Sequence, residues 1–130
     1  MERPAPPLTE RTEQYWRSGA DGKLRVAQCQ KCRRYFHPPQ PVCSHCYSQD
    51  IAFVPVSGKG TVYSWTLNRY QWAPGMKPPY VVAEVELPEQ AGLRILTNIV
   101  DCDPDNVKIG MTVTVAFERA GEAFVPVFRP

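Results

Sequence analysis

Two Cys-x-x-Cys pairs constrain this chain more than any other feature of its sequence. Cys29 and Cys32 form the first pair, Cys43 and Cys46 form the second, and the loop RRYFHPPQPV separates them. Each pair presents two thiolates from a tight turn, and two such turns supply the four ligands of a tetrahedral site. Soft sulfur ligands select zinc, or iron in a rubredoxin-like variant, over magnesium or calcium. The spacing therefore predicts a structural metal site, with Zn²⁺ as the expected ion.

Other uses of these cysteines fit the sequence less well. A thioredoxin-type redox motif uses one pair near a helix start in a βαβ unit, and here two pairs occur without that pattern. A catalytic zinc needs an open coordination position, which four cysteines do not leave. We expect His37 and His45 at the surface or around the metal rather than as ligands, and Cys102 as an ordinary thiol at a strand end.

Length and composition indicate a folded protein of one domain, or of two small ones that share a core. The chain has 130 residues, of which 43% are hydrophobic and 22% charged. Its first twenty residues carry charges throughout, and no apolar run is long enough to span a bilayer, so we expect a cytoplasmic protein without a membrane segment. In a reducing cytosol, paired cysteines hold metal more often than they form disulfides.

The N-terminal twenty residues predict an extended arm followed by a short helix. Three prolines within residues 1–7 exclude a helix there. In the segment that follows, Thr9 is the expected N-cap, Tyr15 and Trp16 form the apolar face, and Gly19 is the expected stop. The two aromatic side chains pack either on this chain's own sheet or on a partner.

The remainder of the chain reads as strands. Residues 23–29 predict a short strand that leads into the first cysteine pair. Five β-rich runs follow the second pair, and their apolar side chains recur with a period of two. They cover residues 58–67, 80–87, 93–100, 111–118 and 123–128. Closing five short strands into a barrel removes exposed sheet edges, and the glycines of SGKG allow the first strand to bend.

The predicted fold class is therefore mainly β, with a short N-terminal helix, a rubredoxin-like zinc ribbon and a five-stranded OB-fold barrel. The corresponding division of the chain is 1–20, 21–52 and 53–130. The connection at residues 68–80 is rich in proline and in large apolar side chains. It either exposes a binding surface or folds over one end of the barrel.

The sequence offers few groups for catalysis. Both histidines lie near the cysteine pairs, and Glu84, Glu86 and the acidic run at 101–105 are explained more simply as solvated side chains. A nucleic-acid-binding ribbon and OB module is the alternative function, since OB folds stack bases on aromatic side chains. However, residues 1–52 hold eight Lys/Arg against five Asp/Glu, whereas residues 53–130 hold seven against eight. A barrel without basic excess makes nucleic acid an unlikely partner.

Six segments, in order, resemble the acyl-CoA-associated family first catalogued as domain of unknown function 35. They are YWRSGADGKL (15–24), CQKCRRYFHPPQPVCSHC (29–46), VSGKGTVYSWT (56–66), PPYVVAEVEL (78–87), ILTNIVDCDPDNVKIGM (95–111) and VPVFRP (125–130). The resemblance covers nearly the whole chain. Members of that family join a rubredoxin-like zinc ribbon to an OB fold.

The resemblance implies a function exercised through a partner. Such proteins work with thiolase-fold enzymes, including thiolases and the retro-aldolases of steroid side-chain breakdown, and help to hold a coenzyme A thioester. It implies a non-catalytic zinc subunit of a hetero-oligomer, without a catalytic residue of its own. The expected contacts with acyl-CoA or the partner are the basic side chains of Lys31, Arg33 and Arg34 and the loop residues Trp72 and Met76.

Overall fold

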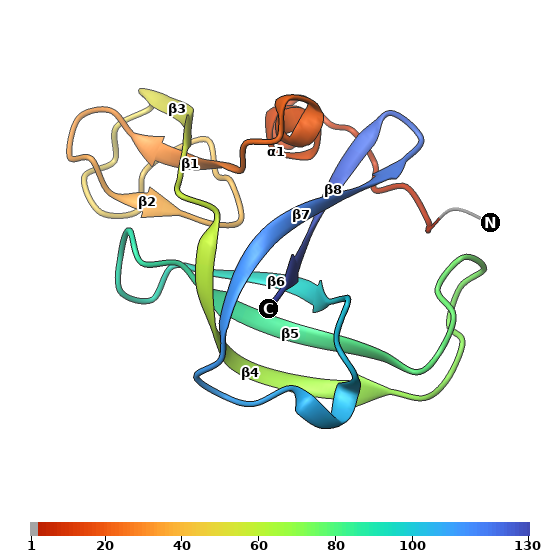
Figure 1. The fold of residues 1–130 in the computed structure, drawn as a ribbon. Helices are drawn as coiled ribbons and strands as arrows, with labels where there is room; N and C mark the ends of the chain where they lie inside the picture. Colours follow the sequence, from red (N-terminus) through yellow and green to blue (C-terminus); the bar gives the residue numbers. More distant parts are fainter. Residues whose placement is uncertain (1–2) are drawn as a thin grey trace.

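The computed structural model describes residues 3–130, which form a three-stranded sheet beside a closed five-stranded barrel (Figure 1). One short helix contacts both the sheet and the barrel. The predicted fold class is confirmed: the chain is mainly β, with a short helix, a ribbon that carries four cysteines and an OB-type barrel. Within residues 3–130, no helix has the length and apolar character that crossing a bilayer requires.

The ribbon consists of three short antiparallel strands in the order β2-β1-β3. Their bounds are β1 (Arg25–Cys29), β2 (Tyr35–Phe36) and β3 (Ile51–Pro55). The sequence predicted only β1, because β2 has two residues and β3 is apolar throughout, so neither shows an alternation of apolar and polar side chains. The predicted boundary at residue 52 falls within β3, which stays paired with β1 as far as Pro55.

The barrel strands lie within two residues of the five predicted runs. They are β4 (Lys59–Asn68), β5 (Tyr80–Glu86), β6 (Arg94–Ile99), β7 (Thr112–Ala120) and β8 (Ala123–Arg129). Their order is β4-β5-β6-β8-β7, and pairing of β4 with β7 closes the barrel. A 3-10 turn at Pro104–Asn106 lies in the connection from β6 to β7, so the acidic run at 101–105 leads into a turn.

Alternation along the strands produces the barrel core. On β5, Val81, Ala83 and Val85 are at most 2% exposed, whereas Glu84 faces solvent. Apolar side chains before the barrel join the same core, including Tyr15 of the helix and Leu24 of the ribbon. Ribbon, helix and barrel therefore share one hydrophobic core.

Glycines before and within β4 allow this strand to pair with both β5 and β7. Gly58 adopts a φ of +80°, which favours glycine. Gly60 faces β5 so closely that an added Cβ would lie 2.3 Å from Val85 Cγ1. Strand β4 pairs with β7 over residues 59–61 and with β5 from Thr61 onward, and a register shift in the β4–β5 pairing follows between Val62 and Ser64. The predicted bend is thus present at this corner of the barrel.

The helix begins and ends later than predicted. Helix α1 (Glu13–Arg17) has Thr12 as its N-cap, whereas Thr9 starts a preceding turn in which the Thr9 and Thr12 hydroxyls lie 2.8 Å apart. The predicted N-cap Thr9 thus lies one turn before the start of α1, although its hydroxyl accepts from Thr12 N–H at 3.2 Å and Thr12 itself makes no side-chain capping bond. Gly19 lies inside a following 3-10 turn (Ser18–Asp21), and the left-handed residue that ends it is Gly22, with φ +79°.

The aromatic face of the helix packs on this chain. Tyr15 is 4% exposed and belongs to the core, and Trp16 packs against it. Gly19 continues this contact, since a Cβ there would lie 2.3 Å from the ring of Phe117 on β7. Of the two alternatives, packing on the chain's own sheet is confirmed.

Substituting Gly19→Ala is expected to destabilise the fold, because the added methyl group overlaps the Phe117 ring. Overpacking of this kind costs about 1–3 kcal/mol. Urea denaturation of the zinc-loaded protein measures the loss. The control is Ala20→Ser at an exposed position of the same turn, which should change stability by no more than about 0.5 kcal/mol. Equal stability of the two variants would contradict the close packing described here.

Candidate metal centre

The four predicted cysteines converge. The sulfur atoms of Cys29, Cys32, Cys43 and Cys46 all lie within 4.8 Å of one another. The Sγ atoms of Cys29 and Cys46 are 3.5 Å apart, and those of Cys32 and Cys43 are 3.7 Å apart. Tetrahedral zinc with bonds of about 2.3 Å places its sulfur ligands about 3.8 Å from one another. The donor set therefore fits Zn²⁺ in both chemistry and spacing.

Two turns of the same backbone design present these sulfurs. In the first, the N–H of Arg33 donates to Cys29 O at 2.8 Å, and the N–H of Cys29 donates to Arg34 O at 2.9 Å. In the second, Tyr47 N–H donates to Cys43 O at 2.8 Å, and Cys43 N–H donates to the carbonyl five residues on at 2.9 Å. Arg33 and Tyr47 hold the same left-handed conformation, with φ values of 68° and 64°. Each cysteine pair thus sits in a separately closed knuckle.

Backbone N–H groups around the sulfurs favour thiolates. Bonds from the N–H groups of Cys32 and Lys31 lower the pKa of the Cys29 thiol to about 6. The N–H groups of Cys46 and His45 likewise lower the pKa of Cys43, with His45 N 3.4 Å from the Cys43 sulfur. Thiolates are the form that binds metal, so the knuckles are prepared for a cation.

Crowding of sulfurs opposes full ionisation. The N–H of Arg34 lowers the pKa of the Cys32 thiol, but desolvation and the three neighbouring sulfurs outweigh it and raise this pKa to about 11. Without a cation the four groups therefore do not all ionise at neutral pH. A bound divalent ion would remove that repulsion, and its four positions would be filled by this chain's own sulfurs.

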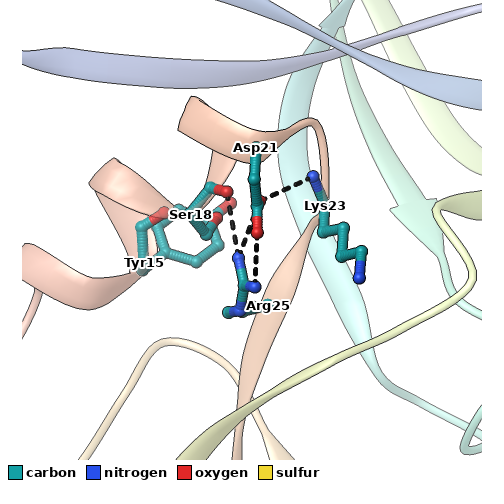
Figure 2. Close-up of polar contacts among 5 residues, drawn as sticks. All are labelled: Tyr15, Ser18, Asp21, Lys23 and Arg25. Carbon is teal, nitrogen blue, oxygen red and sulfur yellow. Dashed lines mark hydrogen bonds and ion pairs between the residues drawn. The ribbon is translucent and has the colours of Figure 1, made fainter.

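An ion pair fixes the N-terminal segment to the ribbon (Figure 2). Both carboxylate oxygens of Asp21 accept from the Arg25 guanidinium, at 2.9 and 2.7 Å, and Arg25 also donates to Ser18 O at 3.1 Å. This bidentate contact, helped by the Lys23 N–H, holds the pKa of Asp21 well below its usual range. Arg25 begins β1, so the helix and the ribbon are oriented together.

A second clamp joins the ribbon to the barrel. The side chain of Gln90 accepts from Tyr35 N–H at 2.9 Å and donates to Tyr35 O at 2.8 Å, as a neighbouring strand would. Gln90 lies in the connection between β5 and β6, so it extends the ribbon sheet from the barrel side. Sequence analysis missed this residue, because nothing in the local pattern distinguishes it from a solvated loop glutamine.

His37 is half-buried and lines a depression on the outer face of the barrel, so its predicted surface position holds only in part. Its ring packs on Tyr15, with ring centroids 4.7 Å apart, and its buried Nδ1 has no hydrogen-bond partner. Burial lowers the pKa of His37 to about 4, so the ring is neutral at neutral pH. His45 is exposed beside the second knuckle, as predicted.

The five predicted ligand contacts fall on two separate surfaces. Lys31, Arg33 and Arg34 are exposed on the first knuckle, and none forms an ion pair within residues 3–130. Trp72 and Met76 lie on the β4–β5 connection, on the opposite side of the molecule from the ribbon (Figure 1). Contact of these residues with acyl-CoA or a partner stays a prediction, and they do not form one site in this chain.

Two depressions lie on the outer face of the barrel, on either side of the exposed Leu96. One, of about 280 Å³, is mainly apolar and includes Trp16, Met76 and Tyr80. The other, of about 430 Å³, includes His37, Glu84 and Arg94.

The two carboxylates of β5, Glu84 and Glu86, lie in different environments on the outside of the barrel. Glu86 accepts from Arg94 Nε at 3.1 Å, and that guanidinium lies 3.6 Å from the centre of the Tyr63 ring. Glu84 is exposed and has no hydrogen bond to His37. Glu84 is therefore a solvated side chain, as predicted, whereas Glu86 is half-buried and paired with Arg94.

Comparison with known proteins identifies both parts of the chain. A family model described as the rubredoxin-like zinc ribbon domain of ChsH2 matches residues 16–52, and one described as the C-terminal OB-fold domain of ChsH2 matches residues 53–118. The solved structure of the Ltp2-ChsH2(DUF35) aldolase contains a similar chain, with a TM-score of 0.87 and 36% identity. The match covers 97% of this chain and 98% of that one.

Two curated relatives are subunits of acyl-CoA enzymes. The probable enoyl-CoA hydratase alpha subunit of Thermomonospora curvata is 38% identical over 98% of this chain, which spans 40% of that relative's length. The benzoylsuccinyl-CoA thiolase subunit BbsA of Thauera aromatica is 35% identical over 62% of this chain, and 56% of that relative is covered. The chain thus spans about half the length of these relatives or less.

Replacing Cys43 by Ser is expected to abolish zinc binding, because three remaining sulfurs leave the tetrahedral shell open. The purified wild-type protein should contain one zinc ion per chain by elemental analysis. Cys102→Ser is the matched control: this fifth cysteine lies outside the site, and the variant should keep its metal. A Cys43→Ser chain that retains one tightly bound zinc would contradict the assignment.

His37 is expected to make stability depend on pH. Its pKa falls from 6.5 to about 4 on folding, so below pH 6.5 the unfolded chain binds a proton that the folded chain excludes. The stability is complete above about pH 6.5 and is lost by up to about 3 kcal/mol as pH falls towards 4. Urea unfolding at pH 7 and pH 5 measures this loss.

The variants His37→Phe and His45→Gln separate this effect from acid release of zinc, which is common to both. His37→Phe should show a smaller loss between pH 7 and pH 5, whereas His45→Gln should match the wild type. An unchanged pH dependence in His37→Phe would show that the buried ring does not cause it.

Proposed function

Because the chain belongs to the ChsH2 family of zinc-ribbon and OB-fold proteins, we propose that it is a zinc-binding accessory subunit of a thiolase-fold enzyme. In this role it stabilises its partner and helps to hold an acyl-CoA thioester during carbon–carbon bond cleavage or formation. The observation that carries the proposal is the closed set of four sulfurs, which leaves the metal no position for a substrate. The similarity to chains of an aldolase complex and of a thiolase supports the class of partner.

The metal has a structural role in this proposal. Binding of zinc by four thiolates contributes on the order of 10 kcal/mol to folding in small metal-held segments. The ribbon strands of two to five residues depend on such a contribution, because they bury little apolar area between themselves. Zinc therefore shapes a surface for assembly, and the partner supplies the acid, base or nucleophile.

The first knuckle is the proposed contact for the coenzyme phosphates. Its three exposed cations project from one turn whose backbone is fixed by the metal ligands on either side. Cationic side chains form charge-assisted hydrogen bonds with phosphate oxygens, and Arg binds them in bidentate fashion. Met76, by contrast, lines the apolar depression of about 280 Å³, which suits an apolar chain rather than phosphate.

Assembly is tested by co-expression with a thiolase-fold protein encoded beside this chain, followed by size-exclusion chromatography. We expect a hetero-oligomer with one zinc per copy of this chain, and we expect Cys43→Ser to lose zinc and partner together. A zinc-free variant that still forms an active complex would refute the structural role of the metal. A chain that stays alone beside every such protein would refute the function itself.

The phosphate contact is tested on the complex by isothermal titration with a coenzyme A thioester. The triple variant Lys31→Ala, Arg33→Asn, Arg34→Ala should weaken binding at least tenfold while the complex remains assembled; Asn is chosen because it tolerates the positive φ of Arg33. A control triple removes exposed cations elsewhere, Lys59→Ala, Lys108→Ala and Arg119→Ala, and should bind as the wild type. Equal binding by the two triples would exclude the knuckle as the phosphate contact.

A further inference from the structure

The β4–β5 connection, residues 68–80, exposes two aromatic rings that the rest of the fold does not use. Tyr70 is 64% exposed and Trp72 is 74% exposed, although Met76 and Tyr80 of the same loop lie in a depression on the barrel. The loop therefore has two parts: one packs against the barrel, and the other carries the two rings into solvent. Large exposed aromatic side chains that gather in this way commonly mark an interaction site.

The two rings are held in place before any partner arrives. Their centroids are 4.6 Å apart, and the planes meet at 56°. Trp72 Nε1 donates to Asn68 Oδ1 at 2.9 Å, and Asn68 Nδ2 donates to Tyr70 O at 2.5 Å. Asn68 is the last residue of β4 and is paired with β5, so the rings are tied to the barrel. Groups that are already ordered lose less entropy when they bind.

The charge around the rings has one sign. Arg69 and Lys77 are exposed on this loop, and residues 68–80 contain no Asp or Glu. Neither cation forms an ion pair with any described residue of the chain. A surface that complements this loop is therefore apolar at its centre and carries carboxylates at its edge.

We propose that Tyr70 and Trp72 anchor this chain to its partner protein, by inserting into an apolar depression rimmed by acidic side chains on the thiolase-fold subunit. The identity of the partner rests on the function proposed above. Tyr, Trp and Arg are the residues that dominate binding energy in protein interfaces. A protein pocket fits better than nucleic acid, because residues 53–130 hold seven Lys/Arg against eight Asp/Glu and so lack the basic excess that binding to phosphates requires.

The experiment measures the affinity of the purified chain for the purified partner at two ionic strengths. Trp72→Ala and Tyr70→Ala should each raise Kd about 30-fold, the effect of removing an interface anchor. Ile109→Ala is the matched control, because Ile109 is a large apolar side chain of similar exposure, 72%, in the turn before β7. It should stay within about threefold of the wild type. The double variant Arg69→Glu, Lys77→Glu should bind more weakly and reverse the salt dependence.

Each other outcome overturns the proposal in a recognisable way. If the wild type binds the partner and both ring variants bind equally well, the rings are not the anchor, and the proposed function stands. If the wild type binds no thiolase-fold protein, the anchor and the proposed function fail together. If Trp72→Ala lowers the melting temperature or loses zinc, the Trp72 ring stabilises the fold and is not an interface anchor. Loss of single-stranded oligonucleotide binding with partner affinity intact would assign the rings to nucleic acid.

Discussion

The convergence of four sulfur atoms within 4.8 Å of one another is the constraint on which the ribbon depends. Backbone N–H groups favour the thiolates of Cys29 and Cys43, while crowding raises the pKa of Cys32. A divalent cation would ease this conflict, since its two positive charges offset two of the four thiolate charges and its four bonds would hold the two knuckles together. The strands around them are too short to hold that arrangement by packing alone.

The position of the knuckles is transmitted to the rest of the molecule through a few specific contacts. Gln90 pairs with Tyr35 from the barrel side, and Tyr15 packs on His37 while it contributes to the barrel core. The Asp21–Arg25 ion pair fixes the helix to β1. These contacts and the shared core connect the metal site to the helix and to the barrel.

The sequence predicts those parts of the structure that repeat at short range. The four metal ligands follow from spacing, and the barrel strands follow from alternation such as Val81, Ala83 and Val85. What it does not predict depends on contacts between distant residues. The strand-like role of Gln90 requires Tyr35, and the buried state of His37 requires Tyr15, so neither has a local signal.

The N-cap shows a different limit of sequence reasoning. Thr9 and Thr12 are both good capping residues, and a local pattern ranks the earlier one first. In the structure their hydroxyls bond to each other, and Thr9 O accepts from the N–H groups of Thr12 and Glu13. Residues 9–12 thus form a separate turn before the helix begins at Glu13. The choice between adjacent caps depends on the geometry by which the N-terminal arm arrives, and that geometry is set by the barrel on which it packs.

The distribution of exposed groups bears on how an accessory subunit works. The basic knuckle and the aromatic loop lie on opposite sides of the molecule (Figure 1), and the ribbon and barrel that carry them share one hydrophobic core. When two contact sites are joined by a flexible chain, binding at each site costs orientational entropy. When both sites belong to one folded unit, that entropy is lost only once, on binding at the first site. In a complex with the proposed partner, docking at the loop would therefore present the knuckle at a fixed place. In such a complex, zinc would contribute to recognition without contacting the partner, because it would fix the positions of the basic side chains of the first knuckle.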